Sequence, residues 1–472
     1  MVTNLKATGF LILAAVLIAA ATLARAQTGD AALYAVRRSD TIARESRVFE
    51  QLSALEHMRR ANVYAANRAF AEARAHWQAV ISDYPSDTNV PAALFGSGRT
   101  NFQERRYEEA LRFFEKVARE YPQTKDGREG LNSSAAALLR LGRASEAAAR
   151  YGEYVEKYPA GERIESAYLN VIDSWREADR RREAMNWITL ARARFPGAAM
   201  ETSALFAQLR LHVAEGEWHQ AVQTANELLS KPIQRGVLTS ADEIAYLRSY
   251  SLERAGRTDE AIRSYLAIPA HSNSYYGALA TERLSRMNSA AAAQAARERV
   301  ERVRKQVVGA ARLYPAPYRA DILRFAKPRG LDPRLVLAIM KEESQFRPGV
   351  KSPAAARGLL QLTLDAASRF AKRAGVRNLT ENQLYDPSVS IAIGSAYLAE
   401  LNQMFPNLPE AIAASYNGGE DNVSRWVKRA KQNDRGVFAS EVGFTESKNY
   451  VFKVMSTYQA YQQLYTSDLQ QR

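Results

Sequence analysis

The sequence predicts an all-α protein in two parts, a ladder of repeated helix pairs followed by a second, mainly helical region. Three observations predict this fold class. A sequence pattern that ends in proline recurs every 37 residues between about residues 55 and 265. An Ala- and Arg-rich stretch follows at 285–312, and Asp332-Pro333 marks the start of a new helix. The length of 472 residues also exceeds what one hydrophobic core usually organises, so two or more units are expected.

The first 26 residues are typical of a cleavable signal peptide. A short basic start precedes an apolar run over residues 9–23, and Ala24-Arg25-Ala26 supplies the small-x-small pattern of a cleavage site. The apolar run is close to the roughly 20 residues that span a bilayer, so a single membrane anchor is the alternative. The Ala-Arg-Ala end favours cleavage, and we expect a periplasmic protein without a stable membrane anchor.

Composition restricts the chemistry. The 65 Lys and Arg outnumber 51 Asp and Glu, for a net charge of +14, which suits a carboxylate-bearing or polyanionic partner and equally serves solubility. The chain has no Cys, which excludes disulfides, thiol nucleophiles and thiolate metal sites. The last of the five histidines is His271, so any chemistry beyond it must proceed without a His base or a His metal ligand.

The ladder has its best copy in Glu109-Ala110, Phe114 and Tyr121-Pro122. The prolines of successive copies are each 37 residues apart, at Pro85, Pro122, Pro159 and Pro196, and weaker copies contain Gln220-Ala221 and Glu260-Ala261. A small residue lets two helices approach closely, an aromatic residue one turn later fills the groove, and proline ends the second helix. We therefore expect Trp77, Phe114 and Tyr151 to be inter-helix core residues.

This pattern resembles the second half of a tetratricopeptide repeat (TPR). The period of 37 and the missing Trp/Leu-Gly signature of the first helix depart from that family and leave the curvature open, including whether the solenoid closes into a ring. We expect residues 27–284 to form a TPR-like α-superhelix that serves as scaffold or as a surface for protein partners. Helical solenoids also bind RNA, but the export signal argues against a nucleic-acid partner.

Residues 285–312 are predicted to form a linking helix. The stretch from Ala290-Ala291-Ala292-Ala293 to Arg304-Lys305 has high helix propensity and lacks glycine before Gly309. Its charges are most simply a solvated helix face. We expect a separate domain to follow, over residues 313–472.

One carboxylate of this domain is placed unusually. Asp332 is an N-cap acceptor followed by Pro333 at the first helical position. At about 100° per residue from Val336, Glu343 falls at about 340°, within the apolar face, and Glu342 at about 240°, beside it. Burial raises a carboxyl pKa, which would suit an acid that protonates a glycosidic oxygen. The alternative is a helix-end Glu that turns to solvent, because Arg347-Pro348 ends the helix nearby.

Four segments of this region occur in a specific order: Ala338-Ile339-Met340-Lys341-Glu342-Glu343-Ser344-Gln345-Phe346, Ser352-Pro353-Ala354-Ala355-Ala356-Arg357-Gly358-Leu359-Leu360-Gln361-Leu362, Ser415-Tyr416-Asn417-Gly418-Gly419, and Phe444-Thr445-Glu446-Ser447-Lys448-Asn449-Tyr450-Val451. They resemble the four motifs of the soluble lytic transglycosylase (SLT) family. The resemblance implies a lysozyme-like, mainly α-helical SLT domain.

The resemblance also implies roles for individual residues. Glu343 matches the family's catalytic acid/base, preceded here by Glu342 where the family usually has Gln. Gln361 matches the glutamine that lines the sugar site, and Leu360 replaces a Met of similar volume. The other matching substrate-site residues are Ser352 in the second motif, Tyr416 and Asn417 of the cleft floor, Glu446 as substrate-side acid, and Tyr450 facing the catalytic Glu.

The implied activity is a peptidoglycan lytic transglycosylase. It would cleave between N-acetylmuramic acid and N-acetylglucosamine without water, give 1,6-anhydro products, and require neither cofactor nor metal. One alternative is a hydrolytic muramidase that uses Glu446 or Asp421 as a second carboxylate. Another is a non-catalytic periplasmic adaptor that binds glycan through this domain and a partner through the repeats.

Overall fold

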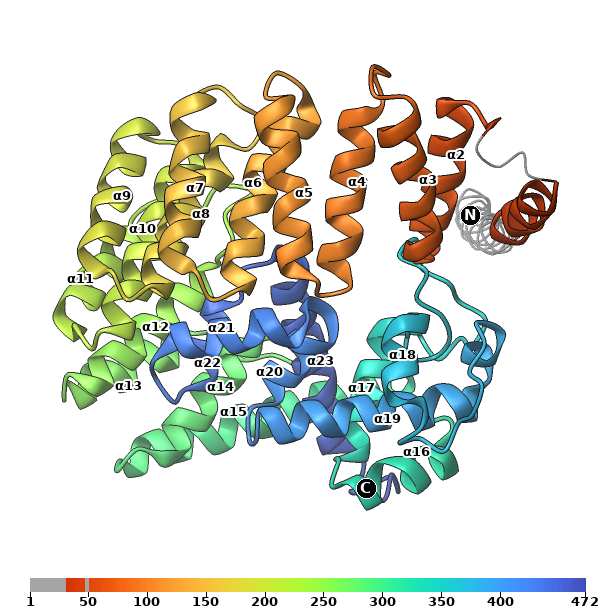
Figure 1. The fold of residues 1–472 in the computed structure, drawn as a ribbon. Helices are drawn as coiled ribbons and strands as arrows, with labels where there is room; N and C mark the ends of the chain where they lie inside the picture. The colour runs from red at the N-terminus through yellow and green to blue at the C-terminus, as the bar shows by residue number, and fades with distance from the viewer. Residues whose placement is uncertain (1–30, 47–50) are drawn as a thin grey trace, which may run out of the picture. The chain divides into compact units, whose positions relative to one another are not determined.

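The computed structural model describes residues 31–46 and 51–472, so the predicted signal peptide lies outside the described residues. The described chain is built of helices, and its only strand-like pairings are isolated bridges such as Lys351 with Arg357 (Figure 1). The predicted all-α fold class, a TPR-like repeat followed by a mainly helical region, is confirmed. Among the helices of residues 31–46 and 51–472, none is long and apolar enough to cross a membrane.

The chain divides into two compact units. Unit 1 is Met1–Ser133 with Glu343–Gly394, and unit 2 is Ser134–Glu342 with Ser395–Arg472. Each unit therefore combines part of the repeats with part of the C-terminal region. Three helices pass from one unit into the other: α6 (Lys125–Arg140), α17 (Pro333–Ser344) and α19 (Pro387–Met404). The predicted division at residues 26, 284 and 312 stays a prediction.

The 37-residue period of the sequence is also the spacing between the starts of successive repeat helices. The second helix of each pair begins at Phe70, Tyr107, Ala144, Arg181 or Trp218, each 37 residues after the one before. These helices are α3 (Phe70–Asp83), α5 (Tyr107–Glu120), α7 (Ala144–Lys157), α9 (Arg181–Arg194) and α11 (Trp218–Leu229). The first four end two residues before the prolines of the ladder, which cannot continue a helix.

The repeated small residue lies in the core in every copy of the ladder. Ala73, Ala110, Ala147, Ala184, Ala221 and Ala261 all have no exposed surface. Trp77, Phe114 and Tyr151 are buried as well, which confirms that they are core residues. A side chain on Gly96 would lie 2.7 Å from the Trp77 ring, so glycine on the partner helix α4 (Val90–Gln103) is needed for this packing.

Unit 1 contains the beginning of the ladder and a segment from the C-terminal region. A helix over residues 31–45, α2 (Ala54–Ala66), α3, α4 and α5 share one apolar core. The C-terminal segment adds the loop after α17, α18 (Leu364–Ala371) and the short 3-10 helix η4 (Asn382–Tyr385). The Arg68 guanidinium joins the two parts by donating to both carboxylate oxygens of Asp365 at 2.7 Å.

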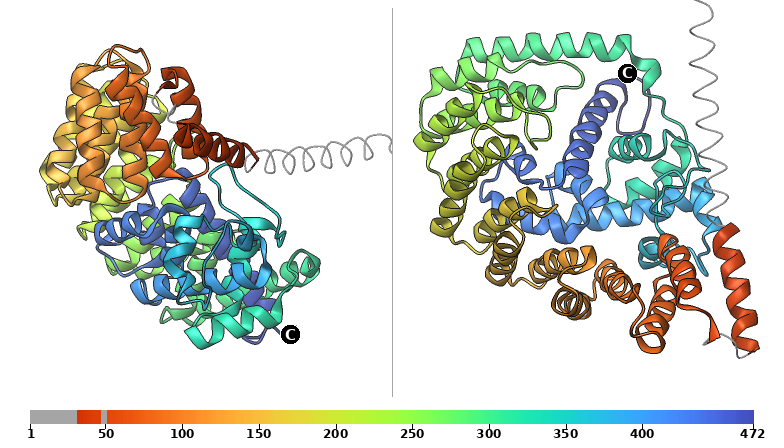
Figure 2. Two further views of the ribbon diagram at one scale, coloured as in Figure 1. Left: turned by 45° about the vertical axis from the view of Figure 1, so that its right-hand side comes forward. Right: turned by 90° about the horizontal axis from the view of Figure 1, so that it is seen from above.

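Unit 2 continues the ladder and holds the last helices of the chain. The remaining repeat helices are α8 (Ile164–Glu177), α10 (Ala199–Ala214), α12 (Ala241–Arg254), α13 (Thr258–Ala267) and α14 (Tyr275–Arg286). The long helix α15 (Ala290–Gly309) occupies most of the predicted linker (Figure 2). It is followed by η2 (Ala311–Leu313), α16 (Arg319–Ala326) and η3 (Lys327–Arg329).

The last four helices of unit 2 pack against one another and, as a group, against the repeat helices. They are α20 (Pro409–Gly418), α21 (Glu420–Ala430), α22 (Arg435–Glu441) and α23 (Thr445–Leu464). Helix α21 lies against α8 and α10, α22 against α10, α12 and α14, and α23 against α14 and α15. Ala430 and Val437 belong to the same apolar cluster as residues of α10, α11 and α12. The repeats and the C-terminal helices of this unit therefore share one core.

Candidate active site

Helix α17 begins as the sequence predicted. The Asp332 carboxylate accepts from the Arg334 backbone N–H at 2.9 Å and from its guanidinium, and it also accepts from the Tyr458 hydroxyl on α23 at 2.8 Å. Burial alone would raise the pKa of Asp332, but these donors and the Arg334 charge hold it below its usual value. The N-cap therefore also joins the start of α17 to α23.

The apolar face of α17 is broader than a helical wheel suggests. Every residue from Leu335 to Met340 is buried, on all sides of the helix. Glu343 lies beyond this buried stretch and is half-buried, in the last turn. Glu343 is therefore partly buried because it stands at the end of a helix that is buried on all sides, and not because it belongs to one apolar stripe. The raised pKa of its carboxyl stays a prediction.

Glu342 is engaged on the α23 side. Its Oε1 accepts from the Thr457 hydroxyl at 2.8 Å and lies 3.9 Å from the Lys341 ammonium. The pKa of the Tyr314 phenol is raised mainly by burial and in addition by the negative charge of Glu342 nearby. Glu342 is thus a structural link between α17 and α23.

The loop after α17 carries Ser352 and Gln361 in unit 1. The Ser352 hydroxyl accepts from the Ala356 backbone N–H at 3.1 Å, and two isolated bridges join Arg357 to Lys351 and to Leu362. The Gln361 side-chain Nε2 donates to the carbonyls of Val350 at 3.1 Å and Gly358 at 2.9 Å. Both predicted substrate residues thus belong to one loop that is braced by its own backbone.

Gly358 sets the conformation of this loop. Its φ is 79°, and a side chain there would lie 1.9 Å from the Leu384 carbonyl oxygen. Only glycine fits both the left-handed backbone and the close approach. Leu360, which stands where the family has Met, packs against Gly394 of α19, where a side chain would lie 2.3 Å from it. The motif is therefore a packing unit as well as a candidate binding loop.

Tyr416 and Asn417 lie at the end of α20 in unit 2. The Asn417 Oδ1 accepts from the Ser447 hydroxyl at 2.6 Å, and its Nδ2 lies 3.5 Å from Glu446 Oε1. The Tyr416 ring is 5.3 Å from the Tyr397 ring at 31°. Gly419, with φ of 83°, then ends the helix. The third and fourth motifs are therefore in direct contact.

Glu446 and Tyr450 lie one turn apart at the start of α23. Glu446 is exposed, Tyr450 is half-buried, and Ser447 and Lys448 between them are buried. Glu446 stands in the first turn, where the positive end of the helix dipole favours a carboxylate. Asp421, the other candidate second carboxylate, is in the first turn of α21.

Unit 1 therefore holds Glu343, Ser352 and Gln361, and unit 2 holds Tyr416, Asn417, Glu446 and Tyr450. The sequence interpretation missed several residues that support the segments around these sets. Ser447 donates to Asn417, Thr457 donates to Glu342 beside Glu343, and Lys448 pairs with Glu243 in the repeats. Neither the hydroxyl residues nor Lys448 carries a distinctive sequence signal, because Lys448 has the exposed Glu446 and Asn449 as neighbours and its partner Glu243 is distant in the sequence.

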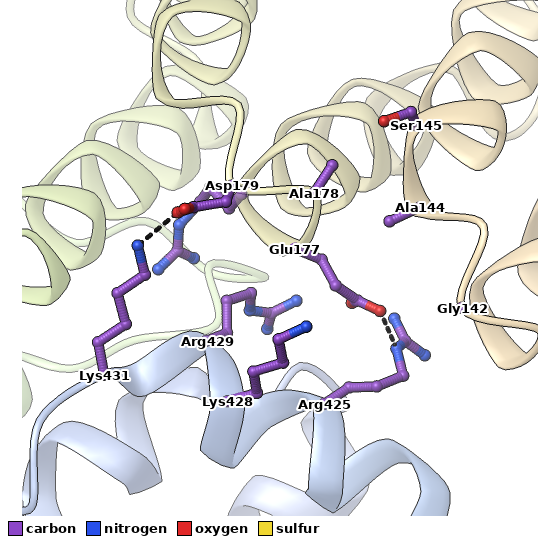
Figure 3. Close-up of a pocket in the computed structure, with 11 residues that line it drawn as sticks. Gly142, Ala144, Ser145, Glu177, Ala178, Asp179, Arg425, Lys428, Arg429 and Lys431 are labelled. Carbon is purple, nitrogen blue, oxygen red and sulfur yellow. Dashed lines mark hydrogen bonds and ion pairs between the residues drawn. The ribbon is translucent and has the colours of Figure 1, made fainter.

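Unit 2 also has a charged pocket of about 480 Å³ where α21 meets the end of α8 and the start of α7 (Figure 3). The Arg425 guanidinium donates to Glu177 at 2.7 Å, and the Lys431 ammonium donates to Asp179 at 2.6 Å. Figure 3 shows Lys428 and Arg429 between these two pairs. None of the seven predicted site residues lines this pocket, so it belongs to the junction of the repeats with α21.

Comparisons with protein families match both regions. The Transglycosylase SLT domain matches residues 322–438, and the Tetratricopeptide repeat matches residues 92–124. The first match contains three of the four motifs, and the fourth, at 444–451, lies after its end at residue 438.

Relatives match part of the chain. A soluble lytic murein transglycosylase of Escherichia coli is 31% identical over 157 residues, which are 33% of this chain and 24% of that protein. A putative soluble lytic murein transglycosylase of Haemophilus influenzae is 36% identical over 129 residues, 27% of this chain and 22% of that protein. The chain thus spans about a quarter of the length of these curated relatives.

Among solved structures, the lytic transglycosylase Slt of Pseudomonas aeruginosa, an inactive mutant, aligns over 93% of this chain and 86% of its own, with a TM-score of 0.49 at 17% identity. The two family matches in sequence, at residues 322–438 and 92–124, are the informative findings. They confirm the resemblance to the SLT family for the C-terminal region and to the tetratricopeptide repeat for the helical ladder.

Proposed function

We propose that the protein is a peptidoglycan lytic transglycosylase. It cleaves the β-1,4 bond between N-acetylmuramic acid and N-acetylglucosamine in glycan strands and releases 1,6-anhydromuramoyl products during cell-wall remodelling or turnover. The observation that carries the proposal is the SLT-domain match over residues 322–438, which includes the Glu343-Ser344 pair at the end of α17. The relatives' names point to the same chemistry.

Glu343 would act first as acid and then as base. Its carboxyl proton goes to the glycosidic oxygen as the bond from that oxygen to C1 of the muramoyl residue breaks. The substrate's own N-acetyl group stabilises the positive charge that develops at C1. The Glu343 carboxylate then takes the proton of the muramoyl 6-hydroxyl while O6 bonds to C1. Glu343 ends protonated, and no water is consumed.

The other predicted residues would bind the sugars. The Gln361 Nε2 is already engaged with two backbone carbonyls, so its Oε1 is the atom suited to accept from a sugar hydroxyl. The half-buried rings of Tyr416 and Tyr450 offer stacking surfaces, and Glu446 with Asn417 offers acceptors and a donor at the substrate side. Ser352 would contribute from the same loop as Gln361.

Mass analysis of sacculus digests tests the proposal. Wild-type protein is expected to release 1,6-anhydromuropeptides, and Glu343→Gln is expected to reduce the rate by at least about a thousandfold, because an amide can neither donate the acid proton nor accept the later one. Glu342→Gln is the matched control and is expected to retain most activity. Equal loss in both variants would contradict the assignment of Glu343.

The product distinguishes the alternatives. Reducing-end muropeptides would mean hydrolysis, with Glu446 or Asp421 as second carboxylate, and would reject the transglycosylase proposal. Sacculus binding without turnover would leave an adaptor function.

We also propose export to the periplasm through the signal-like residues 1–26, which detection of a mature chain that lacks them would test. Protein partners of the repeats, if present, would be found by crosslinking in the periplasm.

A further inference from the structure

Lys448 lies in the fourth motif, between Glu446 and Tyr450, yet its side chain is directed into the repeats. The residue is 2% exposed. Its ammonium lies 2.8 Å from Glu243 Oε1 on α12, and it also donates to the carbonyls of Leu238 at 3.1 Å and Ser440 at 3.3 Å. A lysine ammonium has three N–H donors, so all of them have acceptors.

Glu243 is equally well satisfied. It has no exposed surface, and it accepts from the Tyr276 hydroxyl on α14 at 2.8 Å and from the Thr239 hydroxyl at 2.7 Å. The ring of Phe206 on α10 lies 5.1 Å from the Lys448 ammonium, a cation–π distance. Three repeat helices thus enclose the end of one motif side chain.

This enclosure orders the start of α23. A helix end is the part of a helix that frays first, because its terminal backbone groups lack partners. Here Lys448 holds the first turn on the repeat side, and Ser447 holds it on the α20 side through Asn417. The two residues that face substrate in the proposed function, Glu446 and Tyr450, lie on either side of these anchors.

The third motif has a second link of the same kind. The Asn422 Nδ2 donates to the Gly418 carbonyl at 2.7 Å, and the Arg140 guanidinium of α6 donates to Asn422 Oδ1. A repeat helix therefore also supports the turn that follows Tyr416 and Asn417. Both motifs of unit 2 that carry predicted substrate residues are held from the repeats.

We propose that Glu243 and Lys448 are positioning residues of the active site: the repeat helix α12, through this buried pair, sets the first turn of α23 and thereby the placement of Glu446 and Tyr450. The inference rests on the proposed function for its effect on catalysis. The repeats then serve as a scaffold and also fix the position of the substrate-binding residues. Displacement of catalytic groups by about 1 Å lowers rates by about a hundredfold.

The matched comparison is Glu243→Gln against Asp434→Asn. Both replace a buried carboxylate by its amide at the same junction. Asp434 accepts from Arg283 and from the Tyr246 hydroxyl at 3.0 Å, but it holds α22 rather than α23. We expect Glu243→Gln to lower kcat for sacculi by about ten- to a hundredfold and Asp434→Asn by less than about threefold, when both are assayed well below their Tm values. Equal loss of kcat in the two variants would overturn the proposal.

A double variant separates positioning from stability. Glu243→Gln with Lys448→Met removes both charges, so it should regain the Tm lost in Glu243→Gln alone, because no unpaired charge remains buried. If the pair positions the helix, kcat stays low in this stable protein. Recovery of kcat together with Tm would mean that the pair acts only through folding, and would overturn the proposal.

Hydrogen exchange gives a readout that does not depend on activity. In Glu243→Gln, amides of residues 445–451 are expected to exchange at least about tenfold faster than in wild type, with those of 435–441 unchanged, and Asp434→Asn is expected to show the reverse. Failure of wild type to release anhydromuropeptides would reject the proposed function. Unchanged exchange at 445–451 would reject the positioning role, whatever the activity.

Discussion

Both units join repeat helices to C-terminal segments, but they use different chemistry. In unit 1, Arg68 pairs with Asp365 and Arg37 lies 3.4 Å from Glu381, and each pair has one exposed partner, Asp365 or Arg37. In unit 2, Glu441, Glu243 and Asp434 are buried, and each pairs with a cation on the other side of the junction. Exposed ion pairs contribute about 0–1 kcal/mol, whereas breaking a buried pair costs about 3–5 kcal/mol.

The difference indicates where the molecule tolerates change. The segment with Glu343, Ser352 and Gln361 is braced mainly by its own backbone, and the exposed pairs only add to that. The segment with Asn417, Glu446 and Tyr450 depends on charges supplied by the repeats. We therefore expect changes in the later repeats to alter the segment with Glu446 and Tyr450, and changes near α2 to have little effect on Glu343 and the loop that follows it.

The largest effect is expected from Glu441→Gln. Glu441 accepts from Arg176 at 3.1 Å, Arg210 at 3.2 Å and Arg429 at 2.9 Å, with Asp173 as the second carboxylate of the cluster. The variant leaves three buried guanidinium groups with one carboxylate and should cost about 3–5 kcal/mol of unfolding free energy. Urea unfolding measures this change.

The control for Glu441→Gln is Asp179→Asn. Asp179, one of the residues that line the pocket in Figure 3, pairs with Lys431 at 2.6 Å, and its side chain is 77% exposed. A loss below about 1 kcal/mol is expected there. If both variants lost the same small amount, burial would not explain how unit 2 is held together, and the contrast between the units would disappear.

These junctions explain what the sequence could and could not predict. The ladder was predictable because alanine and proline recur at a fixed local spacing, and the four motifs were predictable because each is contiguous. The junction pairs join residues that are far apart, such as Tyr246 with Asp434, 188 positions away, with no local pattern. The wheel for α17 also could not show that the helix is buried on all sides, because that depends on what surrounds it.

A smaller effect on stability is expected from a change in pH, and the two units should differ in the pH at which they lose stability. In unit 1, His76 Nε2 lies 3.0 Å from the Asp40 carboxylate, and the Nδ1 atoms of His57 and His76 are 2.8 Å apart. Burial lowers the pKa of both imidazoles, against the effect of Asp40. The native state then binds fewer protons than the unfolded state, so its stability is intact above the unfolded pKa of about 6.5 and is lost as pH falls below it.

Unit 2 should respond only at lower pH. Burial would raise the pKa of Glu441, but the three guanidinium groups hold it well below its usual value. Its contribution is therefore present above the unfolded pKa of about 4.3 and is lost as pH falls further. Hydrogen exchange at pH 7.5 and 5.0, corrected for intrinsic rates, should show residues 54–83 opening more easily at pH 5.0 while residues 435–451 remain protected.

Replacing His57 by Leu should flatten this dependence in unit 1, and replacing the exposed His219 by Ala should not. Loss of protection in both regions at the same pH would show that the buried histidines are not the group that titrates. It would also show that the two units unfold together over this range.

The smallest effect is expected from Asp365→Asn in unit 1. Arg68 donates to both oxygens of Asp365 at 2.7 Å, and although burial would raise the pKa of this carboxyl, Arg68 holds it below its usual value. The Asp365 side chain is still 42% exposed, so water screens the pair, and we expect less than about 1 kcal/mol in urea unfolding and an unchanged anhydromuropeptide yield. A loss in yield as large as that of Glu243→Gln would mean that the segment with Glu343, Ser352 and Gln361 also depends on the repeats, which would remove the distinction between the two units.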